Sequence, residues 1–279
     1  HHLLFGGCKY INFICSEVPL QQFFLKFFAY LCPSMEEEAK NLIIDAGNTR
    51  VKIVEVQGDD LRVLAAVTLG DLKNTQSEKK YQGYKKSLLS SVLSSSDTDF
   101  LVQYFQPDHV LSSSSEYPFV NLYQSETLGA DRAANAAFAH TEMLKRKTPV
   151  LIVDIGTCIK FDFVNERGEY LGGSISPGLQ MRYKAMNAFT GRLPLYQNTD
   201  PTPLIGNSTH KSMWSGVING MRAEIQGLIA EYEKQYAGLT TFMTGGDANL
   251  FDMAAKNYIF VNENLTLQGL NLILEHNAK

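Results

Sequence analysis

Two stretches of the chain share one pattern of hydrophobic and polar positions. Each begins with a short apolar run, at residues 41–44 and 149–153, which predicts a buried strand. Each run ends in an aspartate and a glycine-containing turn, and apolar and polar residues then largely alternate over residues 51–56 and 159–163. The alternation predicts a second strand, so each stretch should form a tight hairpin. The repetition indicates two similar domains that face each other.

The remaining sequence alternates between further strands and helices, which predicts an α/β fold. A third strand is expected to follow the first hairpin within residues 41–68, and prolines and glycines mark residues 190–209 as an irregular connection. We predict strands at residues 108–111, 171–176 and 241–243, and helices at residues 76–98, 131–145, 178–188, 212–236 and 266–276.

Composition narrows the class of protein. The 279 residues are 44% hydrophobic and carry a net charge of −4, so neither a nucleic-acid partner nor an anionic membrane is indicated. Four cysteines are too few for a disulfide framework, and they form no Cys-x-x-Cys pair for zinc. A cytoplasmic location fits this cysteine content best. Cys158 is expected to be a small buried residue rather than a reactive one.

Residues 1–34 differ from the rest because they are rich in phenylalanine and cysteine. Charged and polar residues interrupt every apolar run before it reaches the ~18 residues of a membrane span. The segment also lacks the layout of a signal peptide. We expect a non-native extension translated ahead of Met35. An interfacial helix that tethers the protein to a membrane is the alternative.

Both predicted hairpin tips are suited to bind phosphate. Backbone N–H groups and a threonine hydroxyl are exposed at Asp45-Ala46-Gly47-Asn48-Thr49-Arg50 and at Asp154-Ile155-Gly156-Thr157. Such a tip can hold an oxyanion, and the preceding aspartate can hold a hydrated divalent cation. One hairpin alone could be a plain turn that its aspartate caps. Two in one chain favour a polyphosphate held between two domains.

Two further motifs carry candidate chemistry. Asp131 and Arg132 precede an alanine-rich helix, where the aspartate could simply be the N-cap. The pair could also act on a substrate, because a carboxylate accepts a hydroxyl proton and arginine binds a carboxylate bidentately. The glycines of Gly172-Gly173-Ser174-Ile175-Ser176-Pro177-Gly178 and of Thr244-Gly245-Gly246-Asp247 allow close approach of a ligand to the backbone, although each could be an ordinary turn.

Taken together, these motifs resemble those of one family, the type III pantothenate kinases of the sugar kinase, actin and heat-shock ATPase superfamily. The resemblance covers residue 41 to the C-terminus. It implies an α/β fold of two similar ribonuclease-H-like (actin-like ATPase) domains with a cleft between them, at residues 35–148 and 149–279. Its motifs are Asp45-Ala46-Gly47-Asn48-Thr49, Leu128-Gly129-Ala130-Asp131-Arg132, Asp154-Ile155-Gly156-Thr157, the glycine motif extended to Leu179, Thr190-Gly191-Arg192-Leu193-Pro194, residues 207–213 and Thr244-Gly245-Gly246-Asp247-Ala248.

The resemblance implies transfer of the ATP γ-phosphoryl group to the primary hydroxyl of pantothenate, the first step toward coenzyme A. It also implies Mg²⁺, a monovalent cation (K⁺ or NH₄⁺), and a homodimer with the site near the subunit interface. Asp131 resembles the proton acceptor and Asp154 the monovalent-cation ligand. Positions similar to ATP contacts are Asp45, Ala46, Gly47, Asn48, Thr49, Arg50, Val51, Lys52, Thr157, Gly245 and Gly246, and positions similar to pantothenate contacts are Tyr123, Gly129, Ala130, Asp131, Arg132 and Thr209.

Some positions depart from the family pattern. Cys158 stands where alanine is usual, and Lys160 where a small polar residue is common, so Lys160 could alter the local charge. The spacing from Tyr123 to Gly129 is one residue short.

Three rival hypotheses remain from the sequence. The first is a regulator without catalysis on the same scaffold, which the presence of Asp45 and Asp131 disfavours. The second is a sugar or acid kinase of the wider superfamily. The third is a membrane-tethered protein that uses residues 1–34.

Overall fold

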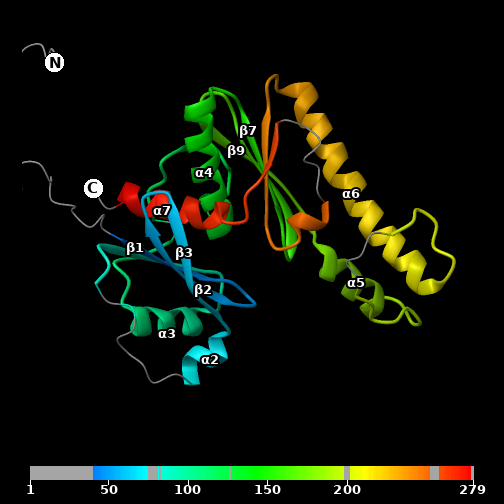
Figure 1. Ribbon diagram of the computed structural model, residues 1–279, viewed down its shortest axis with the longest axis horizontal. Helices are drawn as coiled ribbons and strands as arrows, with labels where there is room; N and C mark the ends of the chain where they lie inside the picture. Colours follow the sequence, from blue (N-terminus) through cyan, green and yellow to red (C-terminus); the bar gives the residue numbers. More distant parts are fainter. Residues whose placement is uncertain are drawn as a thin grey trace, which may run out of the picture. The chain divides into compact units, whose positions relative to one another are not determined.

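The computed structural model describes residues 40–74, 81, 83–112, 114–125, 127–197, 202–251 and 258–277. The predictions for residues 1–34 lie outside this part of the chain. Residues 40–279 form one compact unit (Figure 1). Within the described residues, no helix combines the length and the apolar character that crossing a membrane requires.

Two mixed sheets repeat one strand order, which is evidence for two similar domains. The first sheet has the order β3-β2-β1-β4-β5 and the second the order β11-β10-β7-β8-β9-β6. When the second sheet is read in the direction β9-β8-β7-β10-β11, it matches the order β3-β2-β1-β4-β5 of the first, and β6 is an additional strand beside β9. In both, three antiparallel strands precede two parallel ones. The predicted α/β fold of two similar actin-like domains is confirmed.

The strands of the first sheet are β1 (Asn41–Ala46), β2 (Val51–Gln57), β3 (Asp60–Val67), β4 (Lys86–Ser91) and β5 (His109–Val110). Those of the second are β6 (Val120–Asn121), β7 (Val150–Ile155), β8 (Cys158–Val164), β9 (Glu169–Pro177), β10 (Thr240–Thr244) and β11 (Ile259–Val261). The helices are α2 (Leu69–Asn74), α3 (Ser95–Phe105), α4 (Ala130–Arg146), α5 (Leu179–Ala188), α6 (Thr209–Gln235), α7 (Leu265–Asn277) and the 3₁₀ turn η1 (Ala248–Phe251).

Helices cover both faces of each sheet, so most side chains of the inner strands are buried. The helices α2 and α3 pack on one face of the first sheet, and α5 and α6 on one face of the second (Figure 1). Between the sheets lie α4, which packs on β7 and β8, and α7, which packs on β1 and β4. The boundary predicted at 148/149 stays a prediction.

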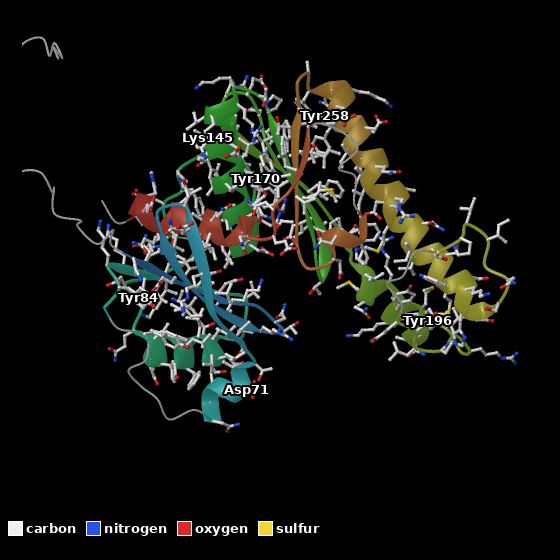
Figure 2. All side chains as sticks on the ribbon, viewed as in Figure 1. Asp71, Tyr84, Lys145, Tyr170, Tyr196 and Tyr258 are labelled. Atoms are coloured by element: carbon white, nitrogen blue, oxygen red, sulfur yellow. The ribbon has the colours of Figure 1, made fainter. Side chains whose placement is uncertain are left out.

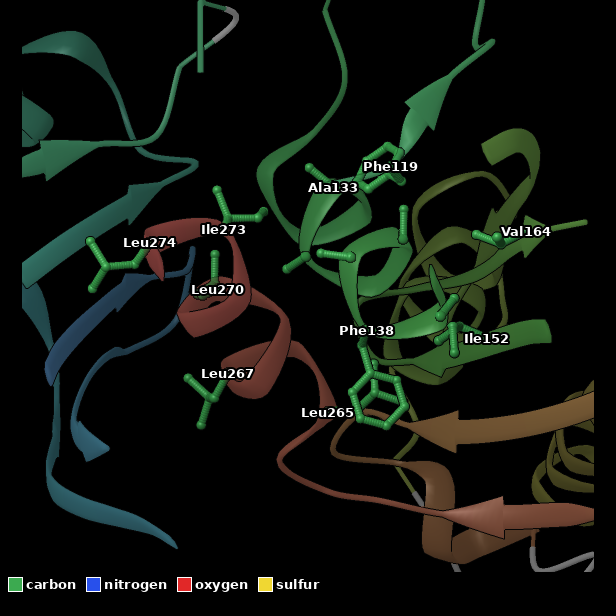
Figure 3. Packing of buried hydrophobic residues seen from close by; sticks show 14 of the residues in the cluster. Phe119, Ala133, Phe138, Ile152, Val164, Leu265, Leu267, Leu270, Ile273 and Leu274 are labelled. Atoms are coloured by element: carbon green, nitrogen blue, oxygen red, sulfur yellow. The ribbon is translucent and has the colours of Figure 1, made fainter. Parts of the chain in front are cut away.

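The contact between α4 and α7 joins the two sheets through one hydrophobic core. Ala133 and Phe138 of α4 and Leu270 of α7 belong to this core together with Ile43 of β1 and Ile152 of β7 (Figure 3). The alanine-rich face of α4 lets the two helices approach closely, because small side chains leave room for a neighbouring backbone. The two halves of the unit therefore share one packed interior.

One glycine is required for this close approach. A Cβ atom at Gly269 of α7 would lie 1.9 Å from the carbonyl oxygen of Ala134 in α4. We predict that Gly269→Ala lowers the free energy of unfolding by ~1–3 kcal/mol, the usual cost of overpacking. In the control Gly227→Ala, at an exposed position of α6, the new Cβ meets nothing within 4 Å. That variant should gain about 0.5–1 kcal/mol from helix propensity. Denaturant unfolding of both variants measures the difference, and equal stabilities would contradict this account.

Most predicted elements match the structure, with one clear error. The helices predicted at 131–145, 178–188 and 266–276 correspond to α4, α5 and α7, and α6 starts three residues earlier than predicted. The helix predicted at residues 76–98 is wrong, because residues 86–91 form β4. Buried parallel strands do not alternate in polarity, and only Leu88 and Leu89 mark this one.

Candidate active site

The two hairpins predicted to bind phosphate are present, and in each an aspartate lies opposite a lysine. Asp45 at the end of β1 pairs across the ladder with Lys52 of β2, and Asp154 at the end of β7 pairs with Lys160 of β8. Residues opposite each other on antiparallel strands point to the same side of the sheet. Each hairpin therefore presents an aspartate and a lysine together beside its turn.

A pocket of about 780 Å³ lies between the two hairpins. It brings together residues from both sheets, from the first turn of α4 and from the start of α7. The predicted site residues that line it are Asp45, Gly47, Asn48, Lys52, Tyr123, Gly129, Asp131, Arg132, Asp154, Thr157, Gly245 and Gly246. Residues separated by up to about 200 positions thus meet in one cavity.

Other predicted site residues do not line this pocket. Ala46 and Val51 are buried in the hydrophobic core of the first sheet, and Thr49 and Arg50 are exposed at the hairpin tip. Ala130 and Thr209 also lie outside it, the latter exposed at the start of α6.

The centre of the pocket is a cluster of opposite charges. The Nζ atom of Lys160 lies 2.5 Å from Oδ2 of Asp131 and 2.7 Å from Oδ2 of Asp154. Burial acts to lower the pKa of Lys160, but the two carboxylates raise it above its ordinary value. Burial raises the pKa of Asp45, and Lys52 opposes that rise. Lys160 therefore stays charged and holds two carboxylates close together.

Asp131 lies inside the first turn of α4, and the N-cap position belongs to Gly129. Its Oδ1 atom accepts a hydrogen bond of 2.8 Å from the backbone N–H of Arg132. The alternative prediction that Asp131 is the N-cap is therefore corrected, although the carboxylate does satisfy one helical N–H. A carboxylate has about four acceptor sites, so Asp131 keeps capacity for a substrate hydroxyl.

Arg132 is buried beside the pocket and held by a polar network (Figure 2 labels Tyr170 of this network). Its Nε donates to Oδ1 of the fully buried Asp162 at 2.8 Å, and Tyr170 donates to the same oxygen at 2.7 Å. Asn135 donates to the other Asp162 oxygen at 3.3 Å. The guanidinium carbon lies 5.1 Å from the ring centroid of Tyr123. The position of Arg132 is thus fixed by charge, hydrogen bonds and aromatic contact.

One donor of this arginine is unpaired. Its Nη2 atom is buried and has no hydrogen-bond partner among the residues that the structure describes. Burial acts to lower the pKa of Arg132, yet Asp162 and Tyr170 raise it, so the guanidinium remains charged. An unpaired charged donor is costly to keep, so such an atom calls for an anionic partner.

The turn after β10 brings backbone close to the second hairpin. Gly245 has φ +95°, and a Cβ atom there would lie 2.3 Å from the carbonyl oxygen of Ile155. The backbone N–H of Asp247 donates to that oxygen at 3.0 Å. Only glycine fits at position 245, so this turn offers flat backbone to the pocket.

The sequence predictions missed seven lining residues, Val92, Thr127, Asn249, Glu263, Asn264, Thr266 and Leu267, whereas Ile175 and Thr244 lie in the two glycine motifs named as possible ligand contacts. Asn249 donates to Glu263 at 2.8 Å, which links η1 to the segment before α7. Thr266 donates to Asn135 at 3.0 Å. The sequence around α7 shows only an ordinary helix start, so nothing in it signalled a place in the site.

Comparison with known proteins identifies one family. A family model described as type III pantothenate kinase matches residues 41–231. A type III pantothenate kinase of Christiangramia forsetii is 41% identical over 85% of this chain and 98% of its own length. The one from Phocaeicola vulgatus is 37% identical over 86% of this chain and 99% of its own.

A solved structure supports the fold alone. A protein from Campylobacter jejuni, described as a Baf family transcriptional activator, superposes with a TM-score of 0.57 at 20% identity. The match covers 85% of this chain and 98% of that one. At this identity the likeness carries no functional conclusion.

Proposed function

We propose that this chain, which belongs to the type III pantothenate kinase family, transfers the γ-phosphoryl group of ATP to the primary hydroxyl of pantothenate. The product is 4′-phosphopantothenate, at the first step of coenzyme A biosynthesis. The observation that carries the proposal is the placement of Asp131 and Arg132 in one pocket with both Asp-x-Gly hairpins. A proton acceptor, an anion-binding arginine and two phosphate turns are what this phosphoryl transfer requires.

Within this proposal, Asp131 accepts the proton of the pantothenate hydroxyl, and Arg132 binds the pantothenate carboxylate. The unpaired Nη2 of Arg132 supports the second role, since a carboxylate would satisfy it. Tyr123 lies against the guanidinium and lines the same pocket, so its ring can contact the bound substrate as well. With one end held, the hydroxyl can lie in line with the γ-phosphoryl group.

ATP would lie between the hairpins, with its phosphates on the turns after Asp45 and Asp154. The flat backbone at Gly245 and Gly246 supports a nucleotide lying there. Lys52 is exposed and lines the pocket, where its ammonium can neutralise phosphate charge.

The chemistry of the donors fits Mg²⁺. No group of three or more metal-ligating side chains occurs among the described residues. That is compatible with Mg²⁺, which is usually held by one or two carboxylates, waters and substrate phosphates. Asp45 beside the first turn supplies such a carboxylate, and the ion would neutralise charge on the transferred group.

We also propose a homodimer. Phe189, Leu204 and Ile205, in the segment between α5 and α6, are 88%, 80% and 81% exposed. Large apolar side chains exposed on one connecting segment support an interface with a second copy of the chain. Thr209 lies just beyond this segment and outside the pocket, so as a substrate contact it would serve the site of a second copy. A cytoplasmic location stays a prediction from the cysteine content.

The test is a coupled ATP-turnover assay with pantothenate, a hexose or acetate as acceptor, with product mass determined. We expect turnover only when pantothenate is the acceptor, and a product that is heavier than pantothenate by one phosphoryl group. Turnover with the hexose or acetate would favour another kinase of the superfamily. No turnover with any acceptor would favour the regulator hypothesis, which Asp45 and Asp131 in one pocket disfavour.

A further inference from the structure

We propose that the ammonium group of Lys160 acts as a built-in monovalent cation of this active site, so that turnover requires no added K⁺ or NH₄⁺. The inference rests on the proposed kinase function and concerns the same pocket. Lys160 departs from the small polar residue that is common in the family. Asp154, to which the resemblance assigned the monovalent cation, is the residue opposite Lys160 on the neighbouring strand.

The geometry puts the lysine ammonium against the carboxylate to which the resemblance assigned such an ion. Its Nζ atom bridges Oδ2 of Asp154 and Oδ2 of Asp131, at 2.7 and 2.5 Å. The Lys160 side chain is only 15% exposed, and that of Asp154 10%. An ammonium is a compact single positive charge with three donors, so it can replace a bound monovalent ion in both charge and size.

A separate monovalent cation does not fit beside it. Oδ2 of Asp154 is already paired with the Lys160 ammonium. A second cation at either oxygen of this carboxylate would lie within a few ångströms of that fixed positive charge in a largely buried pocket, where like charges repel strongly. The residues of this chain therefore disagree with the family expectation of K⁺ or NH₄⁺.

The internal repeat shows that this position is specialised. Lys52 is the matching residue of the first hairpin, opposite Asp45, and it is exposed. Lys160 is instead mostly enclosed between carboxylates. Three carboxylates, Asp45, Asp131 and Asp154, line a pocket that must accept a polyphosphate. A tethered cation offsets part of their charge permanently, whereas a mobile ion would have to bind first.

The first experiment measures kcat of the unmodified protein with ATP, Mg²⁺ and pantothenate, using choline as the sole monovalent cation and then saturating KCl or NH₄Cl. We expect the same kcat in all three. A rise of more than about tenfold with K⁺, a clear rate effect, would overturn the inference while leaving the kinase function intact.

Two variants of Lys160 distinguish the effect of its charge from the effect of its volume. Lys160→Ser opens the position, so kcat in choline should fall by ~10²-fold, as for loss of one electrostatic stabiliser, and recover with KCl or NH₄Cl. Lys160→Met fills the space without charge, so it should fall similarly and not recover. Lys234→Ala removes a surface ion pair on α6 and should change nothing. Full activity of Lys160→Ser in choline would also overturn the inference.

A binding measurement tests the cation site independently of turnover. K⁺ should raise the melting temperature of Lys160→Ser, because a ligand of the native state stabilises it. It should not do so for the unmodified protein or Lys160→Met, and thallium NMR should detect a bound Tl⁺ only in Lys160→Ser. Specific K⁺ or Tl⁺ binding by the unmodified protein contradicts the inference. If no form phosphorylates pantothenate, the proposed function fails, and this measurement still tests the cation site.

Discussion

Asp131→Asn is expected to lower kcat for pantothenate phosphorylation by ~10²–10⁴-fold, the usual effect of losing a general base. The amide cannot accept the hydroxyl proton. Its oxygen can still accept the backbone N–H of Arg132, which Oδ1 of Asp131 accepts at 2.8 Å. ATP affinity and the melting temperature should therefore stay close to those of the unmodified protein. Steady-state kinetics, ATP binding and thermal unfolding together make this test.

Asp97 of α3, the helix that packs on the first sheet, provides a matched control. Asp97 also lies in the first turn of a helix and also accepts from a lysine, Lys73, at 2.7 Å. Asp97→Asn removes the same charge from the first turn of a helix, so it should leave kcat unchanged and lower the stability only slightly. If Asp131→Asn behaves like Asp97→Asn and keeps more than about a tenth of kcat, Asp131 serves the helix and not the reaction.

The parts of the fold that the sequence predicted are those governed by local patterns. The hairpins around Asp45 and Asp154 combine a glycine turn with alternating strands, so both positions and partners follow from neighbouring residues. The alanine-rich helix α4 and the terminal helix α7 likewise follow from local propensity. The error at residues 86–91 arose because β4 is an inner strand, between β1 and β5. The burial of such a strand is set by elements that are distant in the sequence, so its own residues show no strand pattern.

The site residues on the two hairpins could be predicted from the sequence, whereas those that only tertiary packing brings to the pocket were missed. Thr266 reaches the pocket only because α7 returns to pack between the two sheets. Asp162 of β8 accepts a hydrogen bond from Arg132, which lies 30 residues earlier in the first turn of α4. No sequence pattern predicts a contact between these two positions. Lys160 was noticed as a departure, but its contact with both aspartates required the strand register and the placement of α4.

The second large effect is expected for Asp162→Asn, which removes the charge that balances Arg132. Both side chains are buried, at 0% and 6% exposure. Breaking a buried pair by neutralising one partner typically costs ~3–5 kcal/mol, because the other charge remains without compensation. The free energy of unfolding should fall by that amount. The KM for pantothenate should rise at the same time, since Arg132 loses the carboxylate that orients it.

A double variant separates stability from substrate binding. Replacing both members, as Asp162→Asn with Arg132→Met, leaves no buried charge, and exchanging a whole buried pair is often neutral. The double variant should therefore regain most of the stability that Asp162→Asn loses. It should not regain pantothenate affinity, because no guanidinium remains to bind the carboxylate. Urea unfolding and the KM values for pantothenate and ATP measure both outcomes. Recovery of the pantothenate KM together with stability would mean that Arg132 only packs the interior. Lost affinity in a stable protein would place Arg132 in contact with the substrate.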